Sequence, residues 1–318
     1  MALPTSRDVH IDQMLTNVSI GYKNQSYVAD EAFPFLPVNK QSDIIPKYDQ
    51  SYWFRDEARM AGLGTDIPIA EYAVDTSDTY FCPRHRLGRL LYDETRDNAD
   101  APFNLDSEAV EFLSDKLMLR REVQFVNEQF TTGKWTTDKT GGTDFTVWSN
   151  YGGSSPLVDV TTYQDTVEAL IGREPNKFII GKQVYVQLKN HPDVIDLIKY
   201  TQRGQVTPEI LASLLEFKKL LIGRAIYTTT KTGTAEASVS YTRVWGKHGL
   251  MLYTPDSPSL MTPSAGYTIV WNRVAGALHY VQRFRRDEAE ADLIVCNSYF
   301  TQKRTAGAAG LFLSGAVA

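Results

Sequence analysis

Two adjacent acidic pairs, Asp93-Glu94 and Asp287-Glu288, are the residues whose type and spacing best fit catalysis. Two carboxyl groups placed across a cleft can act as general acid and general base. Both pairs are flanked by arginines, however, and charge runs of mixed sign usually form solvated faces or intersubunit ion pairs. The pattern therefore gives no basis for a catalytic assignment.

The histidines and the short motifs offer no other chemistry. None of the five histidines has a sequence neighbour at metal-ligand spacing, and a structural role is expected for each: His10, His85, His191, His248 and His279. A nucleophile elbow, a phosphate-binding loop and a zinc-protease helix are absent, and Gly62-Leu63-Gly64 lacks the third glycine of a dinucleotide site. We expect no catalytic, cofactor-binding or metal-binding residues and no cofactor.

Composition bounds the class of protein. The chain has 318 residues, 42% hydrophobic residues and a net charge of -5, which is ordinary for a globular protein of one large domain or two connected ones. A protein that grips nucleic acid over a broad face would carry a basic surplus, because it must neutralise phosphates.

Cys82 and Cys296 lie far apart and are expected to be buried free thiols. No apolar run is long enough to span a membrane, so no membrane association is expected.

The elements that would position these residues begin with two non-helical segments. Residues 1 to about 50 are apolar but rich in proline, which forbids a helix and favours an extended segment lying on its own core or on a neighbour. Residues 51 to about 92 begin with Trp53-Phe54, contain a glycine-rich turn and resemble a two-stranded projecting loop. Isolated hairpins are marginal in water, so this loop should need a partner surface.

A long helix and a mixed region follow. Apolar residues at near-helical spacing predict a helix from about 106 to 130, capped by Asp106 or Ser107 and on the order of 35 Å long. The alternating pattern beyond it predicts a compact α/β unit with helices at 161–172, 182–189, 194–200 and 209–217 and strands at 177–180 and 220–227. Further strands are expected at 249–253, 267–271, 277–284 and 291–300, before a weakly specified tail at 306–318.

This order of elements, an α+β arrangement, resembles the Hong Kong 97-type capsid fold of tailed-bacteriophage major capsid proteins. The stretches that carry the resemblance are 15–22, 27–30 and 33–38 in the arm, 53–59 in the loop, Arg121-Glu122 late in the helix, and 175–204 in the α/β unit. The similarity covers most of the chain.

The resemblance implies a division into parts. Residues 1–50 would be the N-terminal arm, 51–92 the extended loop, 93–160 with 255–290 the peripheral domain with its spine helix at about 106–130, and 161–254 with 291–318 the axial domain. Because the recognisable arm begins almost at Met1, a separate scaffolding protein, or none, is expected.

The resemblance also implies a function. The chain would self-assemble as hexamers and pentamers into an icosahedral shell around double-stranded DNA, with a portal and scaffolding or decoration proteins as partners and only weak, non-specific contact with the DNA. It would be part of the virion, assembled in the cytoplasm of the bacterial host. Expected intersubunit contacts are Phe33, Phe35, Trp53, Phe54, Arg55, Asp56 and Glu57.

Two other hypotheses stay open. A tail or connector protein would share the assembly physics but form tubes or twelve-fold rings. A hydrolase acting through an unrecognised carboxylate pair would need a deep polar cleft with strongly perturbed carboxylates.

Overall fold

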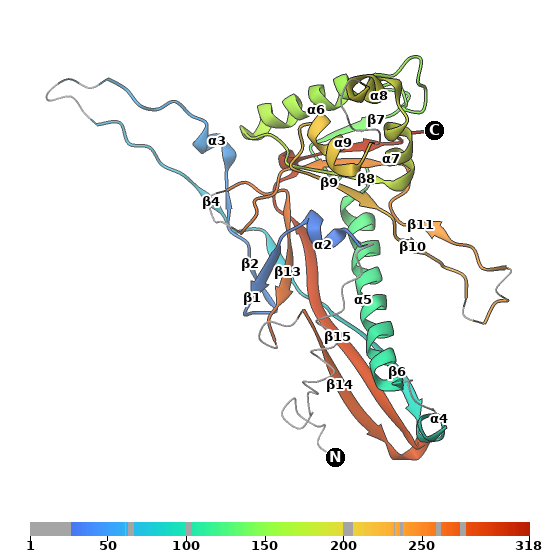
Figure 1. Cartoon of the computed structure of the whole chain (residues 1–318). Coiled ribbons are helices and arrows are strands. Elements are labelled where there is room, and N and C mark those ends of the chain that lie inside the picture. The colour runs from blue at the N-terminus through green and yellow to red at the C-terminus, as the bar shows by residue number, and fades with distance from the viewer. Residues whose placement is uncertain are drawn as a thin grey trace.

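The computed structural model describes residues 27–60, 62, 67–98, 104–199, 206–231, 233–235, 238–258, 262–273 and 278–318. Figure 1 shows an upper unit of helices and strands, a long leg formed by one helix beside twisted strands, and a loop that projects far from both.

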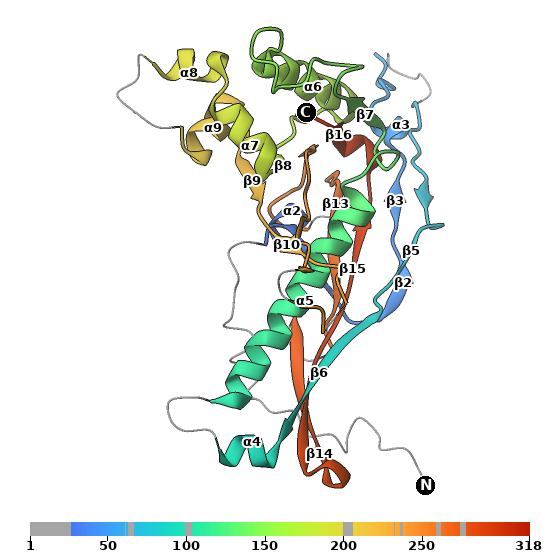
Figure 2. The same ribbon diagram turned by 90° about the vertical axis from the view of Figure 1, so that its right-hand side faces the viewer.

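The leg is built on helix α5 (Leu105–Gln129) and long antiparallel strands. Strand β15 (Ala291–Arg304) pairs with β6 (Arg84–Tyr92), β14 (His279–Arg286) and β13 (Gly266–Trp271). Figure 2 shows α5 running along these strands. Buried side chains of α5 meet buried side chains of the strands in one apolar cluster, composed of Leu91, Ala109, Val110, Leu113, Leu117, Val281, Ile294 and Cys296. The short helix α4 (Asp93–Asp97) lies beside β6 at the lower tip.

Helix α5 begins earlier than its expected caps. Its N-cap is Asn104, whose side chain accepts a hydrogen bond from the backbone N–H of Ser107, while Asp106 and Glu108 lie in the first turn. Acidic residues there are favourable because the N-terminus of a helix carries partial positive charge. Asp106 therefore interacts with the helix end without capping it.

The upper unit contains a five-stranded sheet in the order β7-β16-β12-β8-β9. Its strands are β7 (Thr137–Thr140), β16 (Gly310–Ser314), β12 (Gly249–Leu252), β8 (Lys177–Gly181) and β9 (Lys219–Gly223). Its helices are α6 (Pro156–Ile171), α7 (Lys182–Lys189), α8 (Pro192–Ile198) and α9 (Pro208–Leu214). Proline at the first turn of α6, α8 and α9 suits a helix start, since the missing N–H would have no partner there.

Four strands differ from expectation. The tail is not weakly specified: β16 lies between β7 and β12, and Leu311, Phe312 and Leu313 are fully buried. β15, expected in the axial part, lies in the leg because a tight turn at 287–290 joins it to β14 as a hairpin. β6 was expected at the end of the loop but pairs with β15 in the leg. β7 was expected in the peripheral part but pairs with β16 in the upper unit.

The arm lies on its own body from Tyr27 onward. Helix α2 (Ala29–Ala32) packs on α5, and β1 (Phe35–Val38) pairs in parallel with β13. Residues 1–26 of the expected arm lie outside the described residues. Cys82 and Cys296 are buried free thiols, as predicted. Among the described residues, the helices include none whose length and apolarity would suit a membrane span.

Candidate intersubunit surfaces

One member of each acidic pair considered for catalysis, Asp93 and Asp287, belongs to an ion-pair network at the lower tip of the leg. Arg285 contacts Asp93 at 2.5 Å and Asp287 at 3.3 Å, and Arg96 contacts Asp292 at 2.9 Å. The hydrogen bond from Arg285 lowers the pKa of the Asp93 carboxyl group. A carboxylate held ionised by arginine is a poor general acid, so the role of the network is to hold α4, β14 and β15 together.

The described histidines have structural partners. The His191 Nδ1 atom accepts a hydrogen bond from the N–H of Asp193 and caps α8, and the His248 Nδ1 atom accepts one from the N–H of Gly315. His85 stacks on Phe300, and burial lowers its pKa. Within the described ranges, no group of three His, Cys, Asp or Glu side chains could hold a metal ion. His10 lies outside them.

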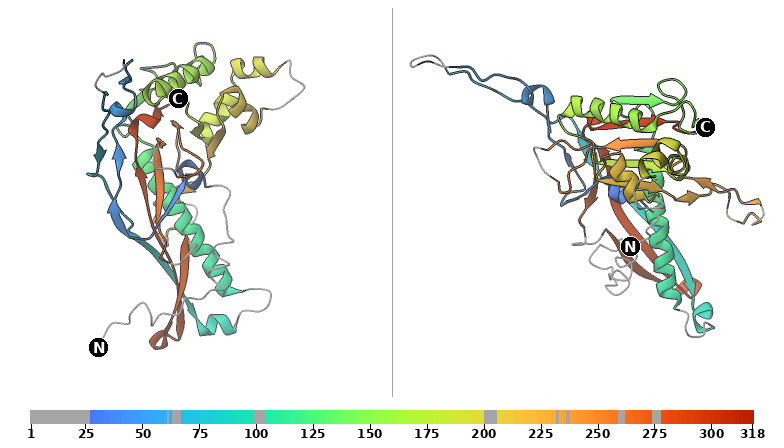
Figure 3. Two further views of the ribbon diagram at one scale, coloured as in Figure 1. Left: turned by 90° about the vertical axis from the view of Figure 1, so that its left-hand side faces the viewer. Right: turned by 45° about the horizontal axis from the view of Figure 1, so that its top comes forward.

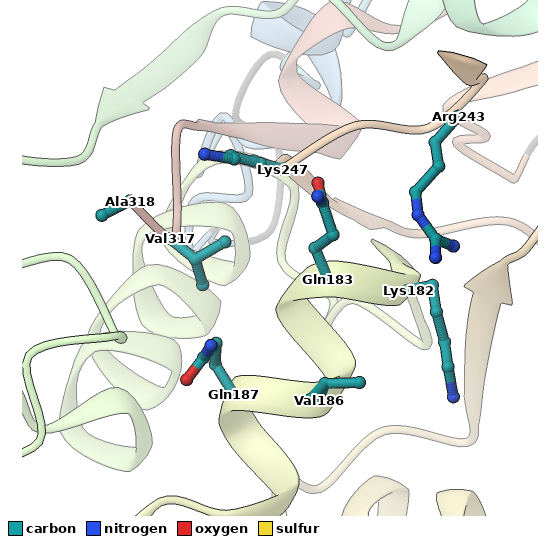
Figure 4. Close-up of a pocket in the computed structure, with 8 residues that line it drawn as sticks. All are labelled: Lys182, Gln183, Val186, Gln187, Arg243, Lys247, Val317 and Ala318. Atoms are coloured by element: carbon teal, nitrogen blue, oxygen red, sulfur yellow. The ribbon is translucent and has the colours of Figure 1, made fainter. Parts of the chain in front are cut away.

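Two open pockets lack the features of a catalytic cleft. The first, of ≈ 260 Å³, is shown in Figure 4 and has no acidic side chain in its lining, which is Lys182, Gln183, Val186, Gln187, Arg243, Lys247, Val317 and Ala318. The second, of ≈ 680 Å³, contains Asp78 and Glu128. Burial alone would raise the pKa of Asp78, but its ion pairs with Lys303 and Lys47 lower that pKa below the ordinary value.

The projecting loop, residues 49–75, is the most exposed apolar part of the described chain. It leaves the body after β2 (Ser42–Ile44) and β3 (Lys47–Tyr48) and returns through β4 (Val74–Asp75) and β5 (Thr79–Phe81). β2 pairs with β5 and β3 with β4, so only short ladders hold its two sides together. Ile67 is 83% exposed and Ile69 is 85% exposed, so neither side chain stabilises the isolated chain.

The root of this loop is anchored on the upper unit. Helix α3 (Gln50–Trp53) is capped by Asp49, which accepts a hydrogen bond from the N–H of Ser51. The Gln50 amide donates to the backbone oxygen of Leu170, at the end of α6. The rings of Tyr48, Trp53 and Tyr72 cluster with centroids about 6 Å apart, at 6.2, 5.9 and 6.2 Å. The root therefore sets the direction in which the loop leaves.

Six of the seven expected contact residues are at least partly accessible. Trp53 is 52% exposed, Phe54 is 64% exposed, and Asp56 is exposed. Arg55 lies over the Tyr52 ring at 4.9 Å and 3.9 Å from Glu57. Phe35, at the start of the edge strand β1, is 37% exposed.

Phe33 is the exception. It is fully buried, and its ring packs edge-on against Phe125 of α5 with centroids 5.0 Å apart. The edge strand β1 starts two residues later, and burial of the Phe33 ring fixes the beginning of that strand on the chain's own core. Phe33 therefore has no surface to offer a neighbour.

Two exposed apolar surfaces were missed by sequence reasoning. Ile67 and Ile69 flank Pro68, and this short stretch without polar residues was a sequence signal for an exposed apolar surface. Strands β10 (Ile226–Tyr227) and β11 (Thr242–Arg243) form a second projecting ribbon with Ile226 and Tyr241 exposed. The continuous apolar run 220–227 hid the break between buried β9 and exposed β10. Figures 1 and 3 show the loop and this ribbon on opposite sides of the upper unit.

Comparison with known proteins gives relatives over nearly the whole chain. No protein-family model matches. The major capsid protein of Burkholderia phage BcepMu is 25% identical over 318 residues, which is 96% of each chain.

Solved structures show the same fold. The crystal structure of a phage-related protein from Bordetella bronchiseptica RB50 aligns with a TM-score of 0.75 at 21% identity, covering 97% of this chain and 98% of that one. The capsid structure of cyanophage P-SCSP1u aligns with a TM-score of 0.59 at 11% identity, covering 94% of this chain and 90% of that one.

Proposed function

We propose that this chain, a homologue of tailed-phage major capsid proteins with the Hong Kong 97-type capsid fold, is the repeating subunit of a virion shell. The observation that carries the proposal is the projecting loop. The loop extends away from the body (Figure 1), and its large apolar side chains are exposed, so a second copy can bury them. Burying such surface is the main driving force of most protein association.

Closed symmetry explains why one loop per subunit can suffice. Each subunit gives its loop to one neighbour and receives a loop from another, so a modest contact repeats around a ring. We propose hexamers and pentamers that close an icosahedral shell around double-stranded DNA in the host cytoplasm. The formal charge of -5 supports weak contact with the DNA, because packaged phosphates would be repelled rather than held.

The parts of the fold receive corresponding roles. The projecting loop is proposed as an intersubunit element, with contact residues Trp53, Phe54, Arg55, Asp56 and Glu57. The arm lies on its own body from Tyr27 onward, so in this part only the exposed residue Phe35 is proposed as a contact. The leg, now including β6 and β15, is proposed as the peripheral domain. The upper unit, now including β7 and β16, is proposed as the axial domain around the symmetry axes.

The remaining partners and the absence of catalysis are also inferences. A portal is proposed for any DNA-filled shell, with scaffolding or decoration proteins as further candidates. A non-enzymatic role is supported by the ion-paired carboxylates at the tip and by the function of the relatives as capsid proteins.

Imaging the purified chain by negative-stain microscopy tests this proposal directly. Closed hollow particles are expected. Tubes or twelve-fold rings would instead support a tail or connector protein, and a chain that stays monomeric at high concentration would overturn the shell assignment.

Replacing Arg55 with glutamate is expected to impair particle formation while leaving the subunit folded. The side chain is half exposed, and the change removes a cation from Tyr52 and places two like charges beside each other at 55 and 57. Particle yield by sedimentation and helix content by circular dichroism are the measurements. Arg55→Lys, which keeps the charge, should assemble; normal particles from Arg55→Glu would refute the contact.

A further inference from the structure

A buried carboxylate joins three parts of the fold that are distant in sequence. Glu122 lies late in α5 and is fully buried. It accepts hydrogen bonds from the backbone N–H of Val28 at 3.1 Å and of Ala29 at 2.8 Å, and from the indole Nε1–H of Trp245 at 2.5 Å. One side chain therefore holds the root of the arm, the long helix and the approach to the upper sheet.

Helix α2 depends on such contacts because it cannot stabilise itself. It has four residues, and its N-cap, Val28, provides no side-chain hydrogen bond. Helices this short are unstable in isolation, and their first N–H groups need acceptors. The carboxylate of Glu122 supplies that acceptor from α5, at the end where the helix dipole favours negative charge.

The neighbouring contacts hold the same short helix. Arg121 is buried, and its Nη1 atom donates to both carboxylate oxygens of Asp30 at 2.7 Å. At the other end of α2, Lys177 of β8 donates to the backbone oxygen of Glu31 at 2.7 Å. Arg121-Glu122, a pair that the sequence singled out, is therefore the main α5 contribution to this attachment.

We propose that Glu122 is a proton-dependent clamp that positions the root of the N-terminal arm, residues 28–32, on α5 and Trp245. Its consequence for particles rests on the proposed function, because the arm root leads directly to Phe35, a proposed intersubunit contact. The clamp itself is a property of the single subunit. Glu122 acts through α2 and is a positioning residue.

Burial of the Glu122 carboxyl group determines how the docking of α2 depends on pH. Burial raises the pKa of Glu122 to about 7 from an ordinary value of 4.5; the N–H groups of Ala29, Trp245 and Val28 lower it, and the charge of Asp30 raises it further. If α2 leaves, water reaches the carboxylate and its pKa returns toward the ordinary value. Docking therefore favours the protonated form: it is strongest below the undocked pKa and weakens as pH rises through about 7.

Other charged groups also surround α2. Burial lowers the pKa of Lys177 to about 8, so its deprotonation favours docking only at higher pH. Arg121 pairs with Asp30, Lys219 pairs with Glu31, and His85 lies near Arg121 with a pKa lowered by burial. Between about pH 5.5 and about pH 7.5, the contribution of Glu122 is therefore the difference between the wild-type profile and the profile of a variant that lacks this carboxyl group.

Amide hydrogen exchange of residues 28–33 in the full chain tests the clamp. Rates are corrected for intrinsic exchange and referred to β12 amides in the same sample. Protection of the arm root is expected to fall as pH rises, by at most about tenfold per pH unit, because one proton is involved. Glu122→Gln cannot titrate and should give a flat profile. The matched control is Glu128→Gln, which removes another α5 carboxyl with a raised pKa that contacts Gln124, and it should keep the wild-type slope.

A second variant covers the case in which Glu122→Gln fails to fold. Trp245→Phe keeps an aromatic ring but removes the N–H that stabilises the ionised carboxylate, so the midpoint of the profile should move to higher pH. A flat wild-type profile, or a Glu122→Gln variant that keeps the slope, would overturn the clamp. Hydrogen exchange is measured on the subunit and does not depend on assembly. If the expected pH dependence is found but no shells form, only the proposed function is overturned.

Discussion

Replacing both Ile67 and Ile69 with serine is expected to abolish shell assembly without changing the stability of the subunit. Both side chains are more than four-fifths exposed, at 83% and 85%, so the isolated fold loses no packing. In a shell, full burial of each isoleucine contributes about 1.5–3 kcal/mol. Losing both weakens every loop contact by roughly 3–6 kcal/mol, which is about 10²- to 10⁴-fold in affinity.

Sedimentation velocity over a concentration series gives the assembly threshold, and urea unfolding gives the stability of the subunit. Val158→Ser, which changes an exposed apolar residue on α6 away from the loop, is the control. A double variant that assembles at the wild-type threshold would show that the loop is not an intersubunit element. A destabilised double variant would show that the loop packs on its own body.

Phe312→Ala in β16 is expected to destabilise the subunit by about 3–5 kcal/mol, the usual cost of deleting a buried aromatic ring. Phe312 is 1% exposed, and its ring lies 5.3 Å from Phe130 and 5.5 Å from His248 between centroids. The substitution removes packing from three elements at once: β16, the end of α5 and the turn before β12.

Phe112→Ala on α5 is the matched control, since it makes the same chemical change at a half-exposed ring. Its effect should stay within about 0.5 kcal/mol. The free energy of unfolding in urea, measured on both variants under identical conditions, separates the two positions. Equal losses would mean that β16 is not an interior strand of the sheet.

Local patterns predicted the elements that have a strong period of their own. The long helix near 106–130 followed from apolar residues recurring every three to four positions, and the structure has α5 at Leu105–Gln129. Strands β8, β13 and β14 likewise appear within a few residues of their expected positions. The capsid fold was predicted from the order of such elements and is confirmed by the solved structures.

Features without a local period were decided by long-range contacts. The tail 306–318 is rich in glycine and alanine and has an apolar run of only three residues at 311–313, yet pairing with β12 and β7 makes β16 an interior strand of the sheet. β10 continues an apolar run in sequence but leaves the sheet after Gly223.

The same division holds for the candidate surfaces. The sequence alone determined that apolar residues occur near 33–38 and 53–54, because composition is local. Only the tertiary structure decided that Phe33 is covered by α5 while Trp53 and Phe54 remain exposed. A side chain is buried when another part of the chain reaches it, and that contact depends on how distant elements pack.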